Sequence, residues 1–259
     1  GYNNVANGYR VLYNNTTGND NIANGTNALS SNTTGDANIA NGTNALFSNT
    51  TGYYNVANGP NALYTNTTGY CNTASGYRAL YTNTTGILNL AIGCTTLDVN
   101  TTGSRNIGLG TSSLAFNTKG HGNVGVGYRS LFYNNYGSTD SVGIVLSAGT
   151  LWNNNTPTYS KYGNIGIGTR ALYSNETGNN NIGIGTSTMD STTTGGSNVA
   201  IGHGTMRNNT TGSHNTVIGF RAGDSIITGD NNIIIGNRAR VDNTDAQGQI
   251  VIGAGAKGM

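Results

Sequence analysis

A segment of seventeen residues recurs along this chain with almost no slippage. Residues 21–35 read NIANGTNALSSNTTG and residues 38–52 read NIANGTNALFSNTTG, so the spacing is 38 − 21 = 17 residues. A short, fixed period is typical of solenoids, in which each repeat forms one coil and stacks on its neighbours. The leading asparagine of the repeat recurs at Asn4, Asn21, Asn38, Asn55, Asn72, Asn89, Asn106, Asn123, Asn164, Asn181, Asn198, Asn215 and Asn232.

Numbered from that asparagine, the first five positions of each repeat predict a short β-strand. The second position is apolar and mostly β-branched, the third is Ala or Gly in most repeats, and the fifth is almost always Gly. Such alternation, ended by glycine, is typical of a strand. The tail of the repeat, Asn-Thr-Thr-Gly, has the composition of a turn. The ninth position holds an aliphatic series: Leu12, Leu29, Leu46, Leu63, Leu80, Leu97, Leu114, Leu131, Leu172, Met189 and Met206.

The pattern therefore predicts an all-β protein, a parallel β-solenoid of the β-roll type with left-handed coils. One strand, a second extended segment around the ninth position and two turns would make one coil. At about 4.8 Å between strands, roughly fifteen coils would give a rod about 70 Å long. We interpret residues 1–259 as a single solenoid.

The repeat changes character near residue 87. The fourth position is polar in the first five repeats and aliphatic afterwards, so the coils of residues 1–86 are wetter than those of residues 87–259. The polar residues at this position are Asn7, Asn24, Asn41, Asn58 and Ser75.

An insertion near residues 152–163 interrupts the period. It carries Trp152, Tyr159, Lys161 and Tyr162, and it includes the only tryptophan of the chain. Insertions in solenoids form surface loops, and an aromatic-rich surface loop is a candidate contact with a partner. A neutral insertion is the alternative interpretation.

The side of the strand that faces the interior decides how the chain associates. The second and fourth positions point to one side, and the third and fifth to the other. If the Ala/Gly side is inside with the leucines, the Val/Ile pairs form an apolar stripe that copies of the chain would have to cover around a shared axis. If the Val/Ile side is inside, one chain suffices and the leading asparagines form an internal amide ladder. We favour the first arrangement, in which the candidate assembly face comprises Ile92, Leu109, Val126, Ile167, Ile184, Ile201 and Ile235.

Composition excludes several classes of partner. The formal net charge is +2 and only 8% of residues are charged, which does not indicate nucleic acid or an anionic membrane surface. The chain contains no run of about 18 apolar residues, so the sequence does not predict membrane insertion. The chain starts at Gly1 without a signal peptide, so we expect a processed product or a segment of a longer protein. Neither end carries a cap, which suggests a fibre fragment or head-to-tail filament.

No constellation of residues indicates catalysis, a metal or a cofactor. The histidines His121, His203 and His214 occupy different repeat positions and have no carboxylate or thiol at ligand spacing. The carboxylates are scattered, and the Gly-x-Gly matches are strand ends that open no helix. Cys71 and Cys94 occupy different repeat positions, which makes a disulfide between them unexpected. We therefore predict a protein that is not an enzyme.

Three repeating surfaces remain. Tyr or Phe at the tenth position, with arginines nearby, would suit sugar faces or a protein partner, or would pack within the solenoid. Paired threonines could form an ice-binding array, although they lie in a turn. Asn-x-Thr sequons would be glycan sites in a glycosylating host and simple turn formers elsewhere. The aromatic residues are Tyr13, Phe47, Tyr64, Tyr81, Phe132 and Tyr173, with Tyr9, Tyr77 and Tyr128 and with Arg10, Arg78, Arg129 and Arg170. The sequon residues are Asn15, Asn32, Asn49, Asn66, Asn83, Asn100, Asn175 and Asn209.

Two stretches of the repeat resemble known fibre proteins. Residues 198–202 (NVAIG) resemble the head repeats of trimeric autotransporter adhesins, which form a left-handed parallel β-roll from three chains. Residues 72–86 (NTASGYRALYTNTTG) are similar to repeats of tail-fibre-type proteins. The period here is longer than in the adhesin heads, and no membrane anchor, coiled-coil stalk or chaperone domain is present.

The sequence and the resemblance together predict an extracellular, cell-surface or virion-surface fibre with a structural or adhesive role. Its partners would be copies of itself, in a homotrimer or a filament, and a host-surface glycan or protein. A receptor-binding tail-fibre segment and an ice-binding solenoid are the alternatives.

Overall fold

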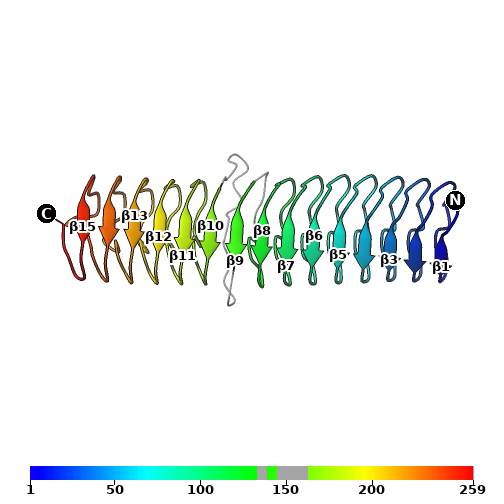
Figure 1. The fold of residues 1–259 in the computed structure, drawn as a ribbon, viewed down its shortest axis with the longest axis horizontal. Helices are drawn as coiled ribbons and strands as arrows, with labels where there is room; N and C mark the ends of the chain where they lie inside the picture. Colours follow the sequence, from blue (N-terminus) through cyan, green and yellow to red (C-terminus); the bar gives the residue numbers. More distant parts are fainter. Residues whose placement is uncertain (133–138, 145–162, 259) are drawn as a thin grey trace. The chain divides into compact units, whose positions relative to one another are not determined.

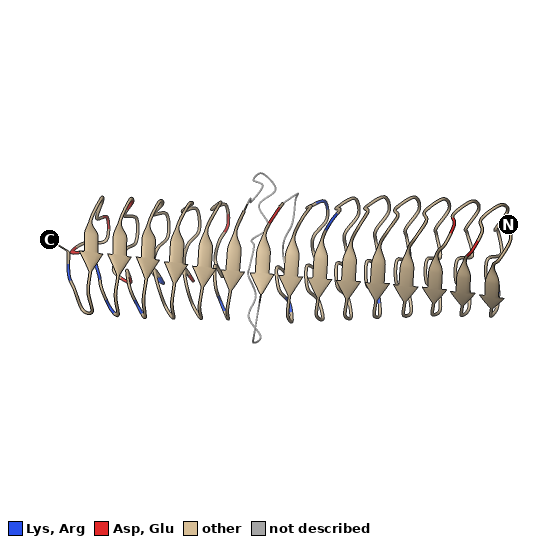
Figure 2. Ribbon diagram, in the orientation of Figure 1, with Lys and Arg blue, Asp and Glu red and all other residues tan. Residues whose placement is uncertain are grey.

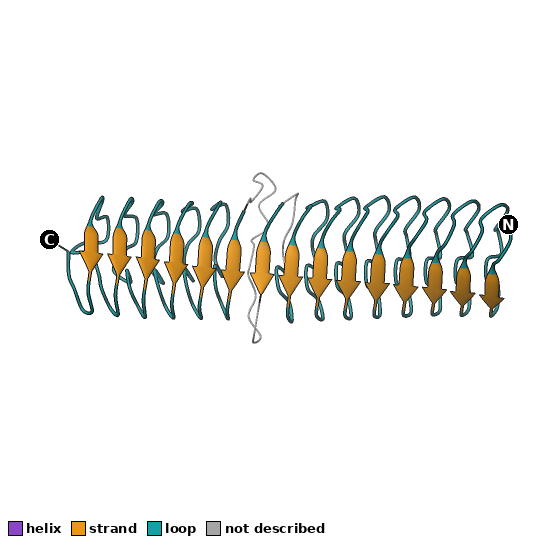
Figure 3. Ribbon diagram, viewed as in Figure 1, coloured by secondary structure: helices purple, strands orange, loops and turns teal. Residues whose placement is uncertain are grey.

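The computed structural model describes residues 1–132, 139–144 and 163–258 of the 259-residue chain. These residues form fifteen parallel strands of three residues each, joined by turns, with no helix among them (Figures 1 and 3). The predicted all-β solenoid with a 17-residue repeat is confirmed.

The chain divides into two compact units. Unit 1 spans Gly1–Val126, and unit 2 begins at Gly127. The composition change near residue 87 therefore falls inside unit 1. The strands of unit 1 are β1 (Val5–Asn7), β2 (Ile22–Asn24), β3 (Ile39–Asn41), β4 (Val56–Asn58), β5 (Thr73–Ser75), β6 (Leu90–Ile92), β7 (Ile107–Leu109) and β8 (Val124–Val126). Those of unit 2 are β9 (Val142–Ile144), β10 (Ile165–Ile167), β11 (Ile182–Ile184), β12 (Val199–Ile201), β13 (Thr216–Ile218), β14 (Ile233–Ile235) and β15 (Ile250–Ile252).

Within each unit, successive strands pair in parallel without a shift in register. Ile22 of β2 lies opposite Ile39 of β3, one period further along the chain. Backbone hydrogen bonds continue beyond the strands, for example from the Leu29 N–H to the Ala45 carbonyl at 3.0 Å. Identical positions of successive repeats therefore lie in files along the stack, as the period predicts.

The interior holds the small residues of the strand. Ala23 in the third position is fully buried, together with Ala28 and Leu29 from the opposite wall of the coil. The favoured arrangement, with the Ala/Gly side inside against the leucine file, is therefore the observed one. Because the third position is so small, the two walls can approach closely around one leucine per coil.

The buried leucines have an unusual backbone conformation. Leu29, Leu46 and Leu63 have φ of 49°, 50° and 51°, in the left-handed region that residues with a Cβ rarely adopt. This conformation costs about 1–2 kcal/mol per residue. Complete burial of a leucine side chain contributes about 1.5–3 kcal/mol, which is of the size needed to offset this backbone cost.

Glycine is required where the strand ends. Gly42 has φ of 136°, and a Cβ placed on it would lie 2.7 Å from the carbonyl carbon of Gly59 in the next coil. The fifth position thus needs glycine both for its dihedral angle and for the close approach of successive coils. This explains why the fifth position is almost invariant along the sequence.

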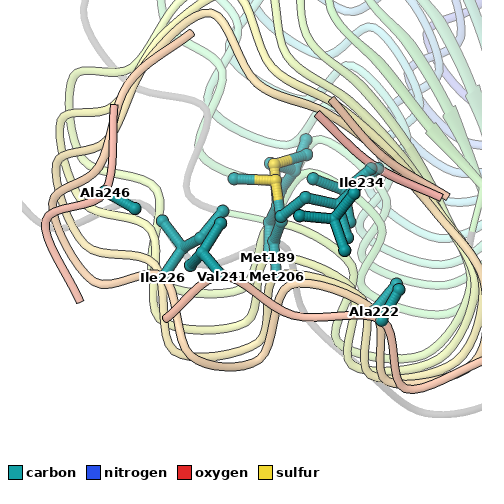
Figure 4. Close-up of a cluster of buried hydrophobic side chains, with 12 residues drawn as sticks. Met189, Met206, Ala222, Ile226, Ile234, Val241 and Ala246 are labelled. Carbon is teal, nitrogen blue, oxygen red and sulfur yellow. The ribbon is translucent and has the colours of Figure 1, made fainter. Parts of the chain in front are cut away.

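The last coils of unit 2 fill the same interior with different side chains. After Met206, the ninth position becomes Gly223, while the third position grows from Ala200 to Val217 and Ile234. Figure 4 shows Met189, Met206 and Ile234 pointing into one shared interior. The small ninth-position residue in one wall is thus accompanied by larger third-position side chains in the other, and cores tolerate substitutions that keep the total volume.

We expect Gly108→Ala to destabilise unit 1 and Gly183→Ala to be tolerated. A Cβ on Gly108 would lie 2.5 Å from Cγ2 of Thr96, whose hydroxyl donates to the Gly110 carbonyl at 2.7 Å and so holds the side chain in place. A Cβ on Gly183 would lie 3.3 Å from the flexible end of Met189. Urea unfolding should show a loss of about 1–3 kcal/mol for the first variant. Equal stability of the two variants would contradict this packing.

Candidate interaction surfaces

The outward side of the strands forms the first candidate surface. We call it the sheet face, and it comprises the second and fourth positions of every repeat. Side chains alternate along a strand, and because the third position is buried, its two neighbours point to solvent. Ile92, Ile201 and Ile235 are 45%, 37% and 36% exposed, whereas Leu109, Val126, Ile167 and Ile184 are half-buried by their neighbours in the file. All seven predicted assembly residues thus lie on the sheet face.

In unit 2 this face is almost entirely aliphatic. Among the described strands β9–β15, Thr216 is the one polar residue at the second or fourth position. Charged residues lie in the turns and not on the strands (Figure 2). At about 3.3 Å per residue and about 4.8 Å between strands, these seven three-residue strands cover roughly 330 Å². The largest apolar patches on typical monomers measure about 300–600 Å² and are often functional.

In unit 1 the first strands carry a file of amides on the same face. Asn24 donates to Oδ1 of Asn41 at 2.9 Å, and Asn41 donates to Oδ1 of Asn58 at 2.9 Å. Asn41 therefore uses one donor and one acceptor along the stack. The coils of residues 1–86, which the sequence predicts to be more polar, present this row of amides at the fourth position. From β6 onwards, aliphatic residues replace it.

The leading asparagines form a second, buried amide file. Nδ2 of Asn38 donates to Oδ1 of Asn21 at 3.1 Å and to the Gly52 carbonyl at 2.8 Å, and the Asn38 backbone N–H also donates to Oδ1 of Asn21 at 3.0 Å. We expected an internal amide ladder only if the Val/Ile side faced inward. That expectation was wrong, because the first position points to the same side as the third and is buried together with it.

The sequon asparagines form a third file, which is also buried. Nδ2 of Asn66 donates to Oδ1 of Asn49 at 2.8 Å and to the Gly69 carbonyl at 2.9 Å. Seven of the eight sequon residues are buried, and Asn15 is half-buried: the buried ones are Asn32, Asn49, Asn66, Asn83, Asn100, Asn175 and Asn209. Both N–H groups of such an amide are used inside the coil, so the folded solenoid has no room for glycans at the buried positions. Burial therefore favours the turn-former interpretation over the sugar column at these seven residues.

Where a turn holds two threonines, they have different surroundings. The first is bonded along the stack, as where the Thr50 hydroxyl donates to the Thr67 carbonyl at 3.1 Å. The second, such as Thr51 or Thr68, is exposed. Each coil thus presents one outward hydroxyl and not the pair that an ice-binding array of both threonines would need.

The tenth-position aromatic residues pack against one another. Phe47, Tyr64 and Tyr81 stack face to face with ring centroids 5.2 and 5.1 Å apart. The guanidinium of Arg78 lies 4.1 Å from the centroid of the Tyr81 ring, and Arg10, Arg129 and Arg170 cover the rings of Tyr13, Phe132 and Tyr173 in the same way. Tyr64 is therefore stacked between two neighbouring rings, and each arginine covers one face of its ring, whereas Tyr13 remains 65% exposed.

Arginine also ties neighbouring coils together. Nε and Nη2 of Arg78 donate to the two carboxylate oxygens of Asp98, at 3.1 and 3.0 Å. This hydrogen bonding raises the pKa of Arg78. Asp98 occupies the tenth position of the next coil, and Arg170 contacts Asp190 in the same arrangement. These pairs explain part of the Arg and aromatic pattern as internal packing.

The remaining predicted sites add no chemistry to the described part of the chain. The loop residues Trp152, Tyr159, Lys161 and Tyr162 lie outside the described residues. Both cysteines are free thiols. Residues 1–132, 139–144 and 163–258 contain no group of three His, Cys, Asp or Glu side chains that could hold a metal, and no helix long and apolar enough to cross a membrane.

Comparison with known proteins gives no assignment: no protein-family profile matches the chain, and no curated protein matches its sequence.

We expect Asn66→Ala to destabilise the fold far more than Asn58→Ala. Removal of the Asn66 amide leaves Oδ1 of buried Asn49 without a donor and one N–H of Asn83 without an acceptor. Each unpaired buried group costs about 1–3 kcal/mol. Asn58 is exposed, so water replaces its lost hydrogen bond and the change should be within about 0.5 kcal/mol. Chemical unfolding of both variants measures the difference, and similar midpoints would argue against a buried amide file.

Proposed function

We propose that this chain is a non-enzymatic structural fibre segment that assembles with copies of itself through the sheet face. The observation that carries the proposal is the outward aliphatic surface of β9–β15, which is uncharged at every second and fourth position. Burying such a surface removes apolar area from water without desolvating any charge.

The geometry of the files favours association between like surfaces. The sheet face repeats once per coil, and two copies therefore present the same spacing to one another. Apolar side chains need no directional partner, so such a surface is complementary to itself. A specific interface buries about 800 Å² per partner, which the roughly 330 Å² estimated for β9–β15 does not reach alone. The residues that directly flank the strands in each repeat would have to contribute as well.

An adhesive role is the extension of this proposal. The fibre would lie outside the cell or on a virion, as the resemblance to adhesin and tail-fibre repeats implies. Tyr64 and Tyr81 are poor candidates for a glycan contact, because stacked neighbours and the Arg78 guanidinium cover their rings. The proposed assembly is either a homotrimer or a filament.

The double variant Ile167→Lys with Ile201→Lys tests it. The two residues lie on alternate strands, so an unchanged strand separates the new charges, and both side chains point away from the core. We expect the apparent dissociation constant of the assembly to rise by about 10- to 100-fold, which corresponds to about 1.4–2.8 kcal/mol. Sedimentation velocity over a concentration series measures the association.

The matched control is Thr194→Lys with Thr228→Lys, which adds the same charge to exposed turn positions of unit 2. These variants should associate like the parent protein. A parent protein that stays monomeric at high concentration, or a sheet-face variant that associates like the control, would rule out the proposal.

A further inference from the structure

Three consecutive coils of unit 1 break the repeat on a surface that is not the sheet face. At the sixteenth and seventeenth positions they carry apolar or aromatic residues, where the two preceding coils and all later described coils carry polar, charged or small ones. We call this surface the turn patch. Its residues are Tyr53, Tyr54, Tyr70, Cys71, Ile87 and Leu88.

The turn patch reaches solvent, with Tyr70, Cys71 and Ile87 half-buried, and its aromatic rings pack on one another. Tyr54 and Leu88 are 62% and 50% exposed. Tyr53 stacks on Tyr70 with centroids 4.7 Å apart, and Tyr54 meets Tyr53 edge to face at 5.4 Å. Partial desolvation and the neighbouring Tyr70, Cys71 and Tyr54 raise the pKa of Tyr53. No core residue requires these large side chains at a turn, so packing does not explain them.

Charges of opposite sign flank the patch at equal distances. Asp36 lies in the coil before Tyr53, and Arg105 lies in the coil after Leu88. Both side chains are exposed. Backbone hydrogen bonds fix the rows, from the Tyr54 N–H to the Asp36 carbonyl at 3.1 Å and from the Arg105 N–H to the Ile87 carbonyl at 3.0 Å. The Tyr70–Cys71 row is the centre of this five-row pattern.

This five-row pattern is complementary to the same pattern on a second copy that runs in the opposite direction. If two copies face each other antiparallel about a two-fold axis in the contact plane, each row lies opposite the row at the same distance on the other side of the centre. Tyr54 then faces Leu88 of the partner copy, and Asp36 lies within reach of Arg105 of that copy. In a parallel arrangement, Asp36 would lie beside another Asp36, and like charges would oppose association.

We propose that the turn patch is an antiparallel, two-fold contact between two copies of this chain, with the two Cys71 residues facing each other at its centre. The five rows cover roughly 20 Å along the stack at about 4.8 Å per row, so the contact is small and weak compared with a standard interface. It uses different residues from the sheet face and does not rest on the assembly proposed above.

Thiol cross-linking tests the contact directly. The chain has two cysteines, so Cys94→Ser leaves Cys71 as the one thiol, and Cys71→Ser leaves the more exposed Cys94 as a matched control. With a short bis-maleimide we expect covalent dimers from Cys94→Ser and at least tenfold fewer from Cys71→Ser. Equal yields from the two variants would overturn the proposal and would favour a different partner for the patch.

The orientation has a separate test. In a chain that lacks both native cysteines, Tyr54→Cys and Leu88→Cys variants are mixed in equal amounts. Antiparallel packing predicts Tyr54–Leu88 heterodimers well above either homodimer, as measured by mass spectrometry. A predominance of Tyr54 homodimers would show parallel packing and contradict the proposal.

Exchange of the flanking charges, in the Cys94→Ser background, tests the pairing of Asp36 with Arg105 of the second copy. Arg105→Asp places two carboxylates together at each end of the contact, and we expect the dimer yield to fall about fivefold, since exposed ion pairs contribute about 0.2–1 kcal/mol each. Asp36→Arg added to Arg105→Asp should restore the yield. An unchanged yield with Arg105→Asp, or no recovery in a double variant whose circular dichroism matches the parent, would contradict the pairing.

The Ile167→Lys and Ile201→Lys variant should cross-link like the parent, which separates this contact from the sheet face.

Discussion

Closure of a coil depends on one buried carbonyl oxygen at the fifteenth position, which is glycine in almost every coil and Ala246 in the coil that starts at Asn232. In the coil that starts at Asn38, the Gly52 carbonyl accepts from Nδ2 of Asn38 at 2.8 Å and from Nδ2 of Asn49 at 2.9 Å. The first of these bonds joins the beginning of the coil to its end. A Cβ at Gly52 would collide with the Asn49 side chain and the next coil, so only glycine allows this approach. A slip of one residue would leave several buried polar groups unpaired at about 1–3 kcal/mol each, which explains why the period is so strict.

This dependence on hydrogen bonds follows from the small core. The four coils that start at Asn21, Asn38, Asn55 and Asn72 each bury two alanines and one leucine, as with Ala40, Ala45 and Leu46. Alanine loses no side-chain entropy on burial but removes little apolar area from water. The amide files compensate because each asparagine bonds to the identical residue above and below it, so one side chain satisfies donors and acceptors in two coils. Repetition in the sequence is thus the means by which the polar interior is paired, and where Ile226 replaces the asparagine of the next coil, Oδ1 of Asn209 has no donor.

The period, the strand positions and the inward direction of the small residues could be predicted from the sequence, because glycine and alternation act locally. Burial of the asparagines was missed for two reasons. Side-chain alternation along the strand already places Asn21 on the same side as Ala23, so its burial follows once Ala23 is known to be inside. Asn49, in contrast, lies in a turn, and a turn residue is expected to be exposed until its neighbours one period away are placed beside it. The end of unit 1 at Val126 had no signal in composition, which changes earlier, near residue 87.

Departures from the repeat separate into two physical kinds. Some compensate for one another inside the coil, as where Gly223 replaces the ninth-position aliphatic residue while Val217 and Ile234 fill the space from the opposite wall. Departures of this kind keep the core filled and carry no information about partners. Others have no compensating change in the interior, and the exposed Tyr54 and Leu88 are of this kind. In a solenoid, where every surface position is copied from coil to coil, an apolar row that the core does not require is a specific signal of contact with another molecule.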